Sequence, residues 1–367
     1  MKKLILAITL LASCNAFSEN PVNLEFEQIM AHGYYAGAQK DSWKKLFKNL
    51  DINAPNKYGE TPLLIASKSG KPHIIKKLIS KGASTKIKNN TGNNALHIAS
   101  SNGNYKILEL LVDLGFDINE PNPHGGTPLI LAIKGQHLAT VRSLIKLGAN
   151  VNLSPKTAIS PLSKAIDNET IASLLIDTGA KIPTDKDSGY RLLSNAMNTN
   201  IDFFATLYSL VKYSPDYVPP NNLKSLFLIA TSGGKVDKVE FLLSKGFRIT
   251  EVDFQGRTVL FGNPIINEKL YTLQYLINKG ANIDAIGRDG TALIYAARRG
   301  KVKSAELLLR NGANPLIKSK GKVLTKEERT KGLTKAPRTA KQWATEKGYF
   351  ELAVLIAQYE HKWRNQH

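Results

Sequence analysis

The chain has 367 residues, of which 42% are hydrophobic, and a formal net charge of +20 at pH 7. This length allows two compact domains or one elongated array, and the hydrophobic fraction argues against a chain that is disordered throughout. The positive charge favours an acidic protein, an anionic membrane surface or nucleic acid as a partner, and it places no constraint on the fold.

The first residues, MKKLILAITLLASCNAFSEN, have the pattern of a secretory signal. Two lysines precede an apolar run from Leu4 to Ala12, and small and polar residues follow. The run is too short to span a bilayer as a stable anchor. We therefore expect a protein that is exported to the periplasm or cell envelope, or secreted, and the signal argues against a nucleic-acid partner.

Two cleavage sites fit this segment. The stretch LASC, from Leu11 to Cys14, resembles the lipobox of bacterial lipoproteins, which implies a signal of residues 1–13 and a lipid on the thiol of Cys14. Ordinary cleavage after Ser18 would instead remove residues 1–18, and Cys14 with them. Because Cys14 is the single cysteine, neither alternative leaves a pair for a disulfide within the chain.

The rest of the sequence is periodic, and its motifs recur at a constant spacing. From Thr61 in TPLLIA, equal steps lead to Asn94 in NALHIA, Thr127 in TPLILA and Ser160 in SPLSKA. The same step connects Ser225 in SLFLIA, Thr258 in TVLFGN and Thr291 in TALIYA, and the interval from Ser160 to Ser225 leaves room for one repeat more. A period of about 33 residues indicates a repeat architecture in which neighbouring units stack.

Each repeat predicts two short helices. In the first, the hydroxyl of Thr61 can cap a helix that begins at Pro62, a residue that needs no N–H partner there. Gly70 is expected to end this helix in a left-handed conformation. Pro72 then starts a second helix, Gly82 ends it, and a polar segment leads to the next repeat as a loop or short hairpin.

These motifs resemble the ankyrin repeat family, whose pattern joins Gly-x-Thr-Pro-Leu-His-x-Ala to a mid-repeat glycine and Leu-Leu-x-x-Gly-Ala. The resemblance covers residues 25–367 and is most specific in the repeats that start near 56, 89, 122, 253 and 286. It implies an all-α repeat solenoid of helix-turn-helix pairs joined by hairpin loops, with about nine to ten units including degenerate caps.

The expected organisation follows from these marks. A degenerate N-terminal capping repeat covers residues 19–55, regular repeats cover 56–180 and 223–315, and a C-terminal capping repeat covers 339–367. Residues 181–222 form a degenerate repeat, which is either an ordinary unit or an interruption of the stack. A basic insertion loop occupies residues 316–338, with eight lysines or arginines against two glutamates, and is either a solvated loop or a docking element for an acidic surface.

The sequence offers no catalytic or metal-binding motif. The seven histidines lack metal-ligand spacing, and no nucleophile elbow, phosphate-binding loop or dinucleotide fingerprint is present. His97 occupies the histidine position of the family, which implies a structural role in tying the hairpin to the helix. We therefore expect a protein that is not an enzyme and needs no cofactor.

The binding surface of such a solenoid lies on its concave side, at the hairpin tips and the exposed ends of the first helices. The candidate partner-binding residues are Lys57, Tyr58, Lys68, Thr91, Asn102, His124, Lys134, Phe254, Gln255, Arg288, Arg298 and Arg299. The sequence favours a scaffold that binds another protein, an acidic one given the charge. Two alternatives stay open: an immunity or inhibitor protein that neutralises a toxin or secreted effector, and a membrane-surface protein that binds anionic lipid through residues 316–338 or through acylated Cys14.

Overall fold

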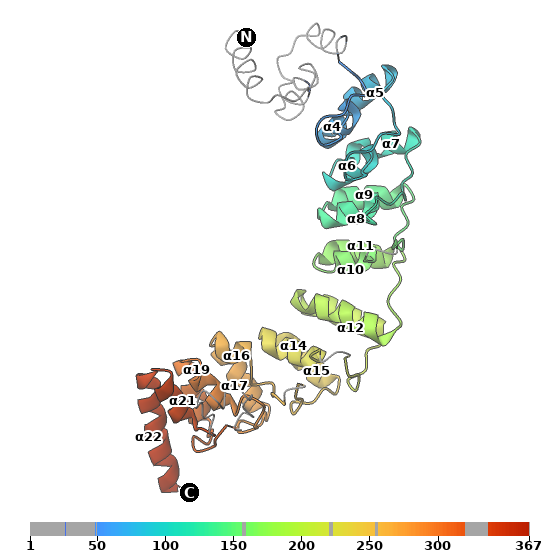
Figure 1. Ribbon diagram of the computed structural model, residues 1–367. Coiled ribbons are helices and arrows are strands. Elements are labelled where there is room, and N and C mark those ends of the chain that lie inside the picture. Colours follow the sequence, from blue (N-terminus) through green and yellow to red (C-terminus); the bar gives the residue numbers. More distant parts are fainter. Residues whose placement is uncertain are drawn as a thin grey trace, which may run out of the picture. The chain divides into compact units, whose positions relative to one another are not determined.

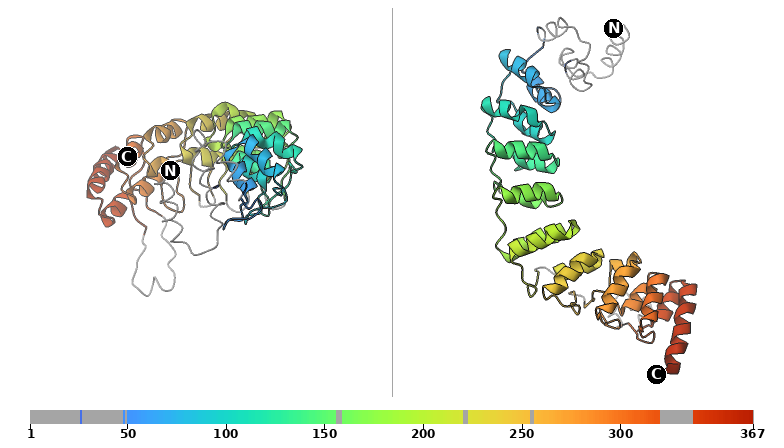
Figure 2. Two further views of the ribbon diagram at one scale, coloured as in Figure 1. Left: turned by 90° about the horizontal axis from the view of Figure 1, so that it is seen from above. Right: turned by 180° about the vertical axis from the view of Figure 1, so that it is seen from behind.

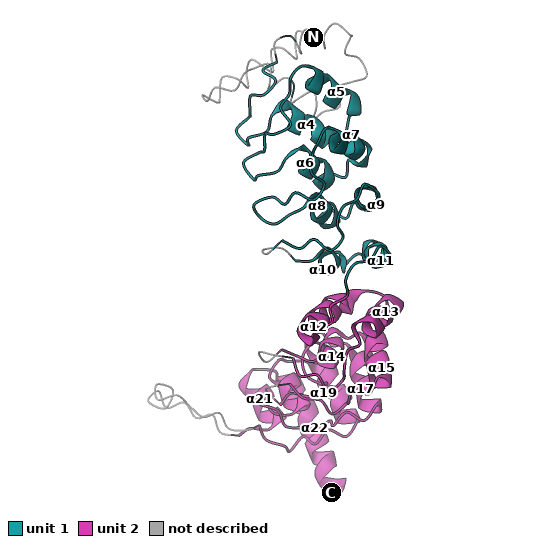
Figure 3. Ribbon diagram, turned by 90° about the vertical axis from the view of Figure 1, so that its right-hand side faces the viewer, with its two compact units in different colours: residues 1–181 teal, residues 182–367 magenta. Residues whose placement is uncertain are grey.

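The computed structural model describes residues 50–155, 159–219, 223–253, 256–319 and 337–366, together with Phe26 and Lys48. The chain divides into two compact units, which are residues 1–181 (unit 1) and 182–367 (unit 2) (Figure 3). Within the described ranges every regular element is helical, apart from two isolated β-bridges. The expected all-α repeat class is confirmed, whereas the signal segment, Cys14 and most of the N-terminal cap lie outside the described residues.

Unit 1 consists of helix pairs that follow one another along the chain. The first helices are α4 (Pro62–Ser69), α6 (Ala95–Ser101), α8 (Pro128–Lys134) and α10 (Pro161–Ala165). The second helices are α5 (Pro72–Ser80), α7 (Leu108–Asp113) with the short η1 (Tyr105–Ile107) before it, α9 (Leu138–Lys146) and α11 (Glu169–Asp177). In Figure 3 the first helices form one row and the second helices form another beside it.

Unit 2 repeats the same pairing, as Figures 1 and 2 show from several sides. Its pairs are α12 (Lys186–Asn195) with α13 (Ile201–Val211), α14 (Leu226–Gly233) with α15 (Val236–Ser244), and α16 (Asn263–Ile266) with α17 (Leu270–Asn278). They continue with α18 (Ala292–Ala297) and α19 (Val302–Arg310), and then α21 (Ala340–Glu346) and α22 (Phe350–Gln366). A short 3₁₀ turn, η2 (Ala196–Asn198), joins α12 to α13, so the degenerate segment also forms a helix pair.

The core of unit 1 is built from equivalent positions of successive first helices. In each repeat a leucine and an alanine are buried against the next helix, and their exposed fractions are 2% or less: Leu63, Leu96, Leu129 and Leu162, and Ala66, Ala99, Ala132 and Ala165. Burying one leucine side chain contributes about 2 kcal/mol, and the small alanine lets the next helix approach closely. No single pair of helices could bury this face, so each repeat depends on its neighbours.

Polar side chains also join the repeats, at the C-terminal ends of the first helices. Asn104 donates from Nδ2 to the carbonyl oxygens of Ser67 (2.8 Å) and Lys68 (2.7 Å) in the preceding repeat. In unit 2, Lys269 donates from Nζ to the carbonyl oxygen of Gly233 (2.8 Å). These bonds satisfy carbonyl groups that the end of a helix leaves without an intrahelical partner.

Side-chain caps begin most of the first helices. The side chains of Asn94, Thr127, Ser160, Ser225, Thr291 and Thr339 each accept a hydrogen bond from the backbone N–H three residues later. The prediction that Thr61 acts in the same way is wrong, because its hydroxyl is buried without a partner among the described residues. Its backbone angles match those of Thr127, so the backbone at the cap does not explain the difference.

The repeat that starts near residue 253 departs from the expected pattern. Thr258 does not begin a helix, and the first helix of this repeat, α16, is reduced to Asn263–Ile266. Gly262 has φ +93°, which is not a helical conformation, so the chain turns between Thr258 and Phe261 and α16 begins only at Asn263. The period therefore locates this repeat correctly but overestimates its helix.

His97 is a buried residue of the repeat, but the hydrogen bond to the hairpin is made by Asn94, and Nε2 of His97 has no hydrogen-bond partner among the described residues. The imidazole is fully buried, and its Nδ1 lies 2.7 Å from Oδ1 of Asn94, whose Nδ2 in turn donates to Glu120 in the following hairpin (2.6 Å). Burial lowers the pKa of the imidazole, and the nearby Glu120 carboxylate opposes this shift. Helix α6 is therefore tied to its hairpin by the Asn94 amide, which His97 contacts from the buried side.

The insertion begins and ends at one point of unit 2. The backbone N–H of Ser319 donates to the carbonyl oxygen of Arg338 (2.8 Å), and that of Arg338 donates to Oγ of Ser319 (3.2 Å). The indole of Trp343 also donates to Ser319 (3.3 Å). Residues 320–336, which hold most of the basic charge of the insertion, lie outside the described residues.

Candidate binding surface

The hairpin tip before α4 presents an exposed tyrosine among the predicted residues. Oδ1 of Asn56 accepts hydrogen bonds from the backbone N–H groups of Tyr58 and Glu60, both at 2.9 Å, and Gly59 adopts φ +74° between them. This asparagine turn projects Lys57 and Tyr58 outward. The Tyr58 side chain is 60% exposed, and Nζ of Lys57 lies 5.2 Å from the centre of its ring.

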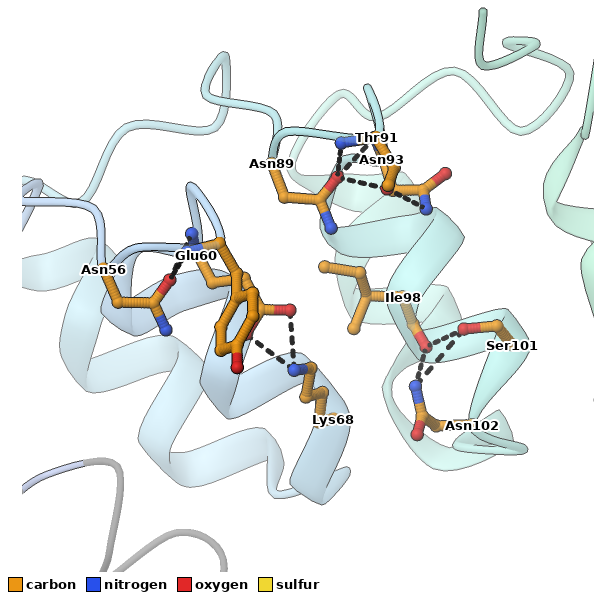
Figure 4. Close-up of polar contacts among 10 residues, drawn as sticks. Asn56, Glu60, Lys68, Asn89, Thr91, Asn93, Ile98, Ser101 and Asn102 are labelled. Carbon is orange, nitrogen blue, oxygen red and sulfur yellow. Dashed lines mark hydrogen bonds and ion pairs between the residues drawn. The ribbon is translucent and has the colours of Figure 1, made fainter. Parts of the chain in front are cut away.

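A cavity of about 330 Å³ opens beside this tip. It is lined by Tyr58, Glu60, Lys68, Asn89, Asn90 and Thr91, so it lies between two successive repeats of unit 1. Three of the predicted binding residues, Tyr58, Lys68 and Thr91, therefore share one site. Figure 4 shows the polar contacts of Glu60 with Lys68 and of Asn89 with Thr91 beside this cavity, and separately those of Asn102 at the end of α6.

The walls of this cavity are held in place by hydrogen bonds between the repeats. Asn90 donates from its backbone N–H to the carbonyl oxygen of Tyr58 (3.0 Å) and from Nδ2 to that of Lys57 (3.0 Å). Nζ of Lys68 lies 2.6 Å from the Glu60 carboxylate. The Tyr58 ring is thus presented by a backbone that two repeats fix in place, so binding there orders little additional chain.

The chemistry of this surface suits a protein partner. Tyrosine offers a large apolar face with a polar end and loses little rotamer entropy, and exposed tyrosines are frequent anchors of interfaces. Asn89, Asn90 and Thr91 make the rest of the wall polar, and their side chains form hydrogen bonds within and between the two tips. Together these groups can bind an apolar side chain of a partner and the polar groups beside it.

The other predicted residues of unit 1 lie outside this cavity. Asn102 is exposed, but its Nδ2 donates to the carbonyl oxygen of Ile98 (2.8 Å), so its amide is partly used to end α6. His124 is exposed at the next tip, where the asparagine turn recurs at Asn122. Lys134 is exposed at the end of α8. These three extend the surface along the repeats.

In unit 2 the predicted arginines differ in exposure. Arg288 and Arg299 are exposed, and the Arg299 guanidinium lies 3.9 Å from the centre of the Tyr295 ring. Arg298 is less accessible, since it lies 3.4 Å from Asp289 and 4.8 Å from the centre of the Trp343 ring. Phe254 and Gln255, also predicted binding residues, lie outside the described residues.

Sequence reasoning missed the residues that complete the cavity beside Tyr58. Glu60, Asn89 and Asn90 are polar and adjacent to predicted residues, but they carry no mark of their own in the repeat pattern. The signal that could have identified them is the recurrence of asparagine five residues before the helix cap, at Asn56, Asn89 and Asn122. This recurrence predicts the asparagine turn and hence the residues beside it.

The described residues contain neither a cluster of metal-binding side chains nor a helix that could span a membrane. Across the described ranges, no group of three or more histidine, cysteine, aspartate or glutamate side chains is arranged to hold a metal ion. In the same part of the chain, no helix combines the length and the apolar character needed to cross a membrane.

Comparison with known proteins identifies the repeat. The family model described as ankyrin repeats (3 copies) matches residues 31–122, 114–187 and 226–319. The chain is 34% identical over 87 residues to "Probable E3 ubiquitin-protein ligase XBOS34" of Oryza sativa subsp. japonica, a match that covers 23% of this chain and 17% of that protein. It is 32% identical over 91 residues to "Palmitoyltransferase Hip14" of Drosophila melanogaster, covering 24% of this chain and 14% of that protein. The matched region is thus a small part of both relatives.

Proposed function

Because the chain belongs to the ankyrin repeat family, we propose that it is a non-catalytic scaffold that binds another protein on the hairpin tips and first helices of its repeats. Ankyrin repeats generally mediate protein–protein interaction. The observation that carries the proposal is the exposed Tyr58 beside the 330 Å³ cavity, held by hydrogen bonds from the next repeat. The enzymatic names of the two relatives belong to proteins of which this chain covers less than a fifth.

The partner we propose is an acidic protein in the cell envelope or outside the cell. The net charge of +20 supports an acidic partner, because opposite charge speeds the encounter of two proteins and makes it sensitive to salt. The signal pattern of the first residues supports export, with the two alternative fates of Cys14 described above. The test of this point is whether the mature protein is recovered from envelope or secreted fractions.

The test of binding compares two tyrosines. Tyr58→Ala removes the proposed anchor, and Tyr105→Ala is the matched control, since Tyr105 is 45% exposed and also has a neighbouring lysine, Lys106, near its ring (6.0 Å). Proteins captured from native extracts by crosslinking should be lost with Tyr58→Ala and retained with Tyr105→Ala. Equal capture by both variants would contradict this placement of the binding surface.

A second candidate function is binding to anionic lipid through the basic insertion. Residues 316–338 contain eight lysines or arginines, and the bonds between Ser319 and Arg338 join the two ends of the segment. Clustered basic residues add about 1 kcal/mol each to binding at an anionic membrane surface. Deletion of residues 320–336 should then abolish salt-sensitive binding to vesicles that contain anionic lipid, while the Tyr58→Ala variant still binds them.

A further inference from the structure

Unit 2 contains a larger cavity than the one beside Tyr58, of about 550 Å³. It lies between the chain that follows α13 and the chain that follows α15. Three apolar side chains on its walls are unusually exposed: Val218 (82%), Leu223 (50%) and Val252 (55%). An apolar lining that remains accessible to water marks a surface suited to a ligand.

Three carboxyl groups line this cavity, those of Asp216, Glu251 and Asp253, and they differ in their ion pairs. The Asp253 carboxylate lies 2.8 Å from Nε of Arg257, and that of Asp216 lies 4.0 Å from Arg248. Among the described residues, no lysine or arginine forms an ion pair with Glu251, whose Oε2 accepts a hydrogen bond from the hydroxyl of Ser225. Burial raises the pKa of the Glu251 carboxyl, while the hydrogen bond from Ser225 and the charge of the nearby Arg248 oppose this shift.

Unit 1 has an equivalent glutamate, Glu120, which does form an ion pair with a lysine. There Asn94 begins the first helix, and its Nδ2 donates to Glu120, which lies 26 residues further along, the same separation as from Ser225 to Glu251. Nζ of Lys88 lies 2.5 Å from Oε1 of Glu120. This lysine lowers the pKa of the Glu120 carboxyl, the opposite direction from that at Glu251.

The register of the repeats explains the difference. Lys88 precedes Glu120 by 32 residues. The residue 32 positions before Glu251 is Pro219, which lines the 550 Å³ cavity and carries no charge. Unit 2 therefore keeps the carboxylate, as Glu251. At the position that corresponds to Lys88 it has the uncharged Pro219, beside an open cavity.

We propose that this cavity binds a lysine side chain from a segment of a second protein, with the ammonium group on Glu251 and the aliphatic stem against Val218, Leu223 and Val252. Lysine fits both parts of the site, since its long stem packs on apolar surface while its charged end reaches a polar partner. The site would complete between two proteins the ion pair that Lys88 and Glu120 make within one. It lies in unit 2 and does not depend on the Tyr58 surface.

The experiment uses the full chain and two matched peptides, Ac-Gly-Leu-Lys-Leu-Gly-amide and the same peptide with norleucine in place of lysine. Binding is followed by the shifts of backbone amide resonances between residues 215 and 253. The lysine peptide should bind about fivefold more tightly than the norleucine peptide, the preference that a partly exposed ion pair of about 1 kcal/mol provides. Glu251→Gln should remove this preference, and Glu120→Gln, the matched control in unit 1, should leave it unchanged.

A further variant supplies the lysine within the chain. Pro219→Lys places a lysine where unit 1 has Lys88, and it should prevent binding of the lysine peptide while the remaining amide resonances stay in place. Equal binding of the two peptides, binding that persists in Glu251→Gln, or absence of shifts at this cavity would overturn the proposal. The spectrum of the wild-type protein without peptide is also compared with that of a variant lacking residues 320–336. Differences at residues 215–253 would show that the chain's own basic segment occupies the cavity, and would overturn the proposal as well.

Discussion

Asn104 provides a sharp test of how neighbouring repeats hold together. Its Nδ2 donates to two carbonyl oxygens of the preceding repeat, those of Ser67 and Lys68, at 2.8 and 2.7 Å. A hydrogen bond contributes a net of about 0.5–1.5 kcal/mol, and the bond to Lys68 belongs at the lower end because it is exposed. Asn104→Ala should therefore lower the free energy of opening of these repeats by about 1.5 kcal/mol.

Native-state hydrogen exchange is the suitable assay, because a repeat protein can open in parts and a single unfolding midpoint would mix them. A loss of this size makes the amides of α4 and α6 exchange about tenfold faster. The matched control is Asn102→Ala, which removes only bonds within its own repeat, to Ile98 and Ser101. If both variants exchange at the same rate in α4, the hydrogen bonds of Asn104 between repeats do not stabilise the stack.

Two further predictions concern buried polar groups in unit 1. Thr61→Val should leave the free energy of unfolding unchanged or raise it, because the hydroxyl has no partner among the described residues. Thr127→Val should lower it by about 1 kcal/mol, because it removes a helix cap. Equal urea midpoints of the two variants would contradict this difference. Burial lowers the pKa of His97 in the folded protein below its ordinary value of 6.5, so the unfolded chain binds the proton more readily. The contribution of neutral His97 to stability is therefore complete above pH 6.5 and declines as the pH falls below that value. Between pH 7.5 and 5.5 the wild type should therefore lose more stability than His97→Gln, and parallel losses would show that His97 is not responsible.

The sequence predicts the stacking because the same residue types return at the same places. Leucine and alanine at equivalent positions of each repeat predict the buried face, and a polar residue before each helix predicts most of the caps. It does not predict that the Thr61 hydroxyl makes no cap, because Thr61 has the same residue type and the same backbone angles as Thr127, which does. Nor does the period predict the shortened α16, although Gly262 within the expected helix is a visible sign that the helix is interrupted there.

The candidate sites were harder to predict, because each depends on contacts between residues of different repeats. Tyr58, Lys68 and Thr91 could be identified as surface positions of the repeat, but the cavity that joins them depends on Asn90 reaching back to the preceding tip. The cavity at Glu251 is a site where an expected charge is missing. Such a site is recognised only when Glu120 and Lys88 are seen to form an ion pair in three dimensions.

The most direct test of the binding surface is site-specific photocrosslinking at two positions. A benzoylphenylalanine residue is placed at Tyr58 in one variant and at Tyr105 in another, and both are irradiated in the native extract. We expect a discrete, salt-sensitive crosslinked protein from position 58 and none from position 105. Crosslinks of equal yield and identity at both positions, or a partner captured at position 105 alone, would contradict the conclusion that the hairpin tips and first helices of unit 1 bind the partner.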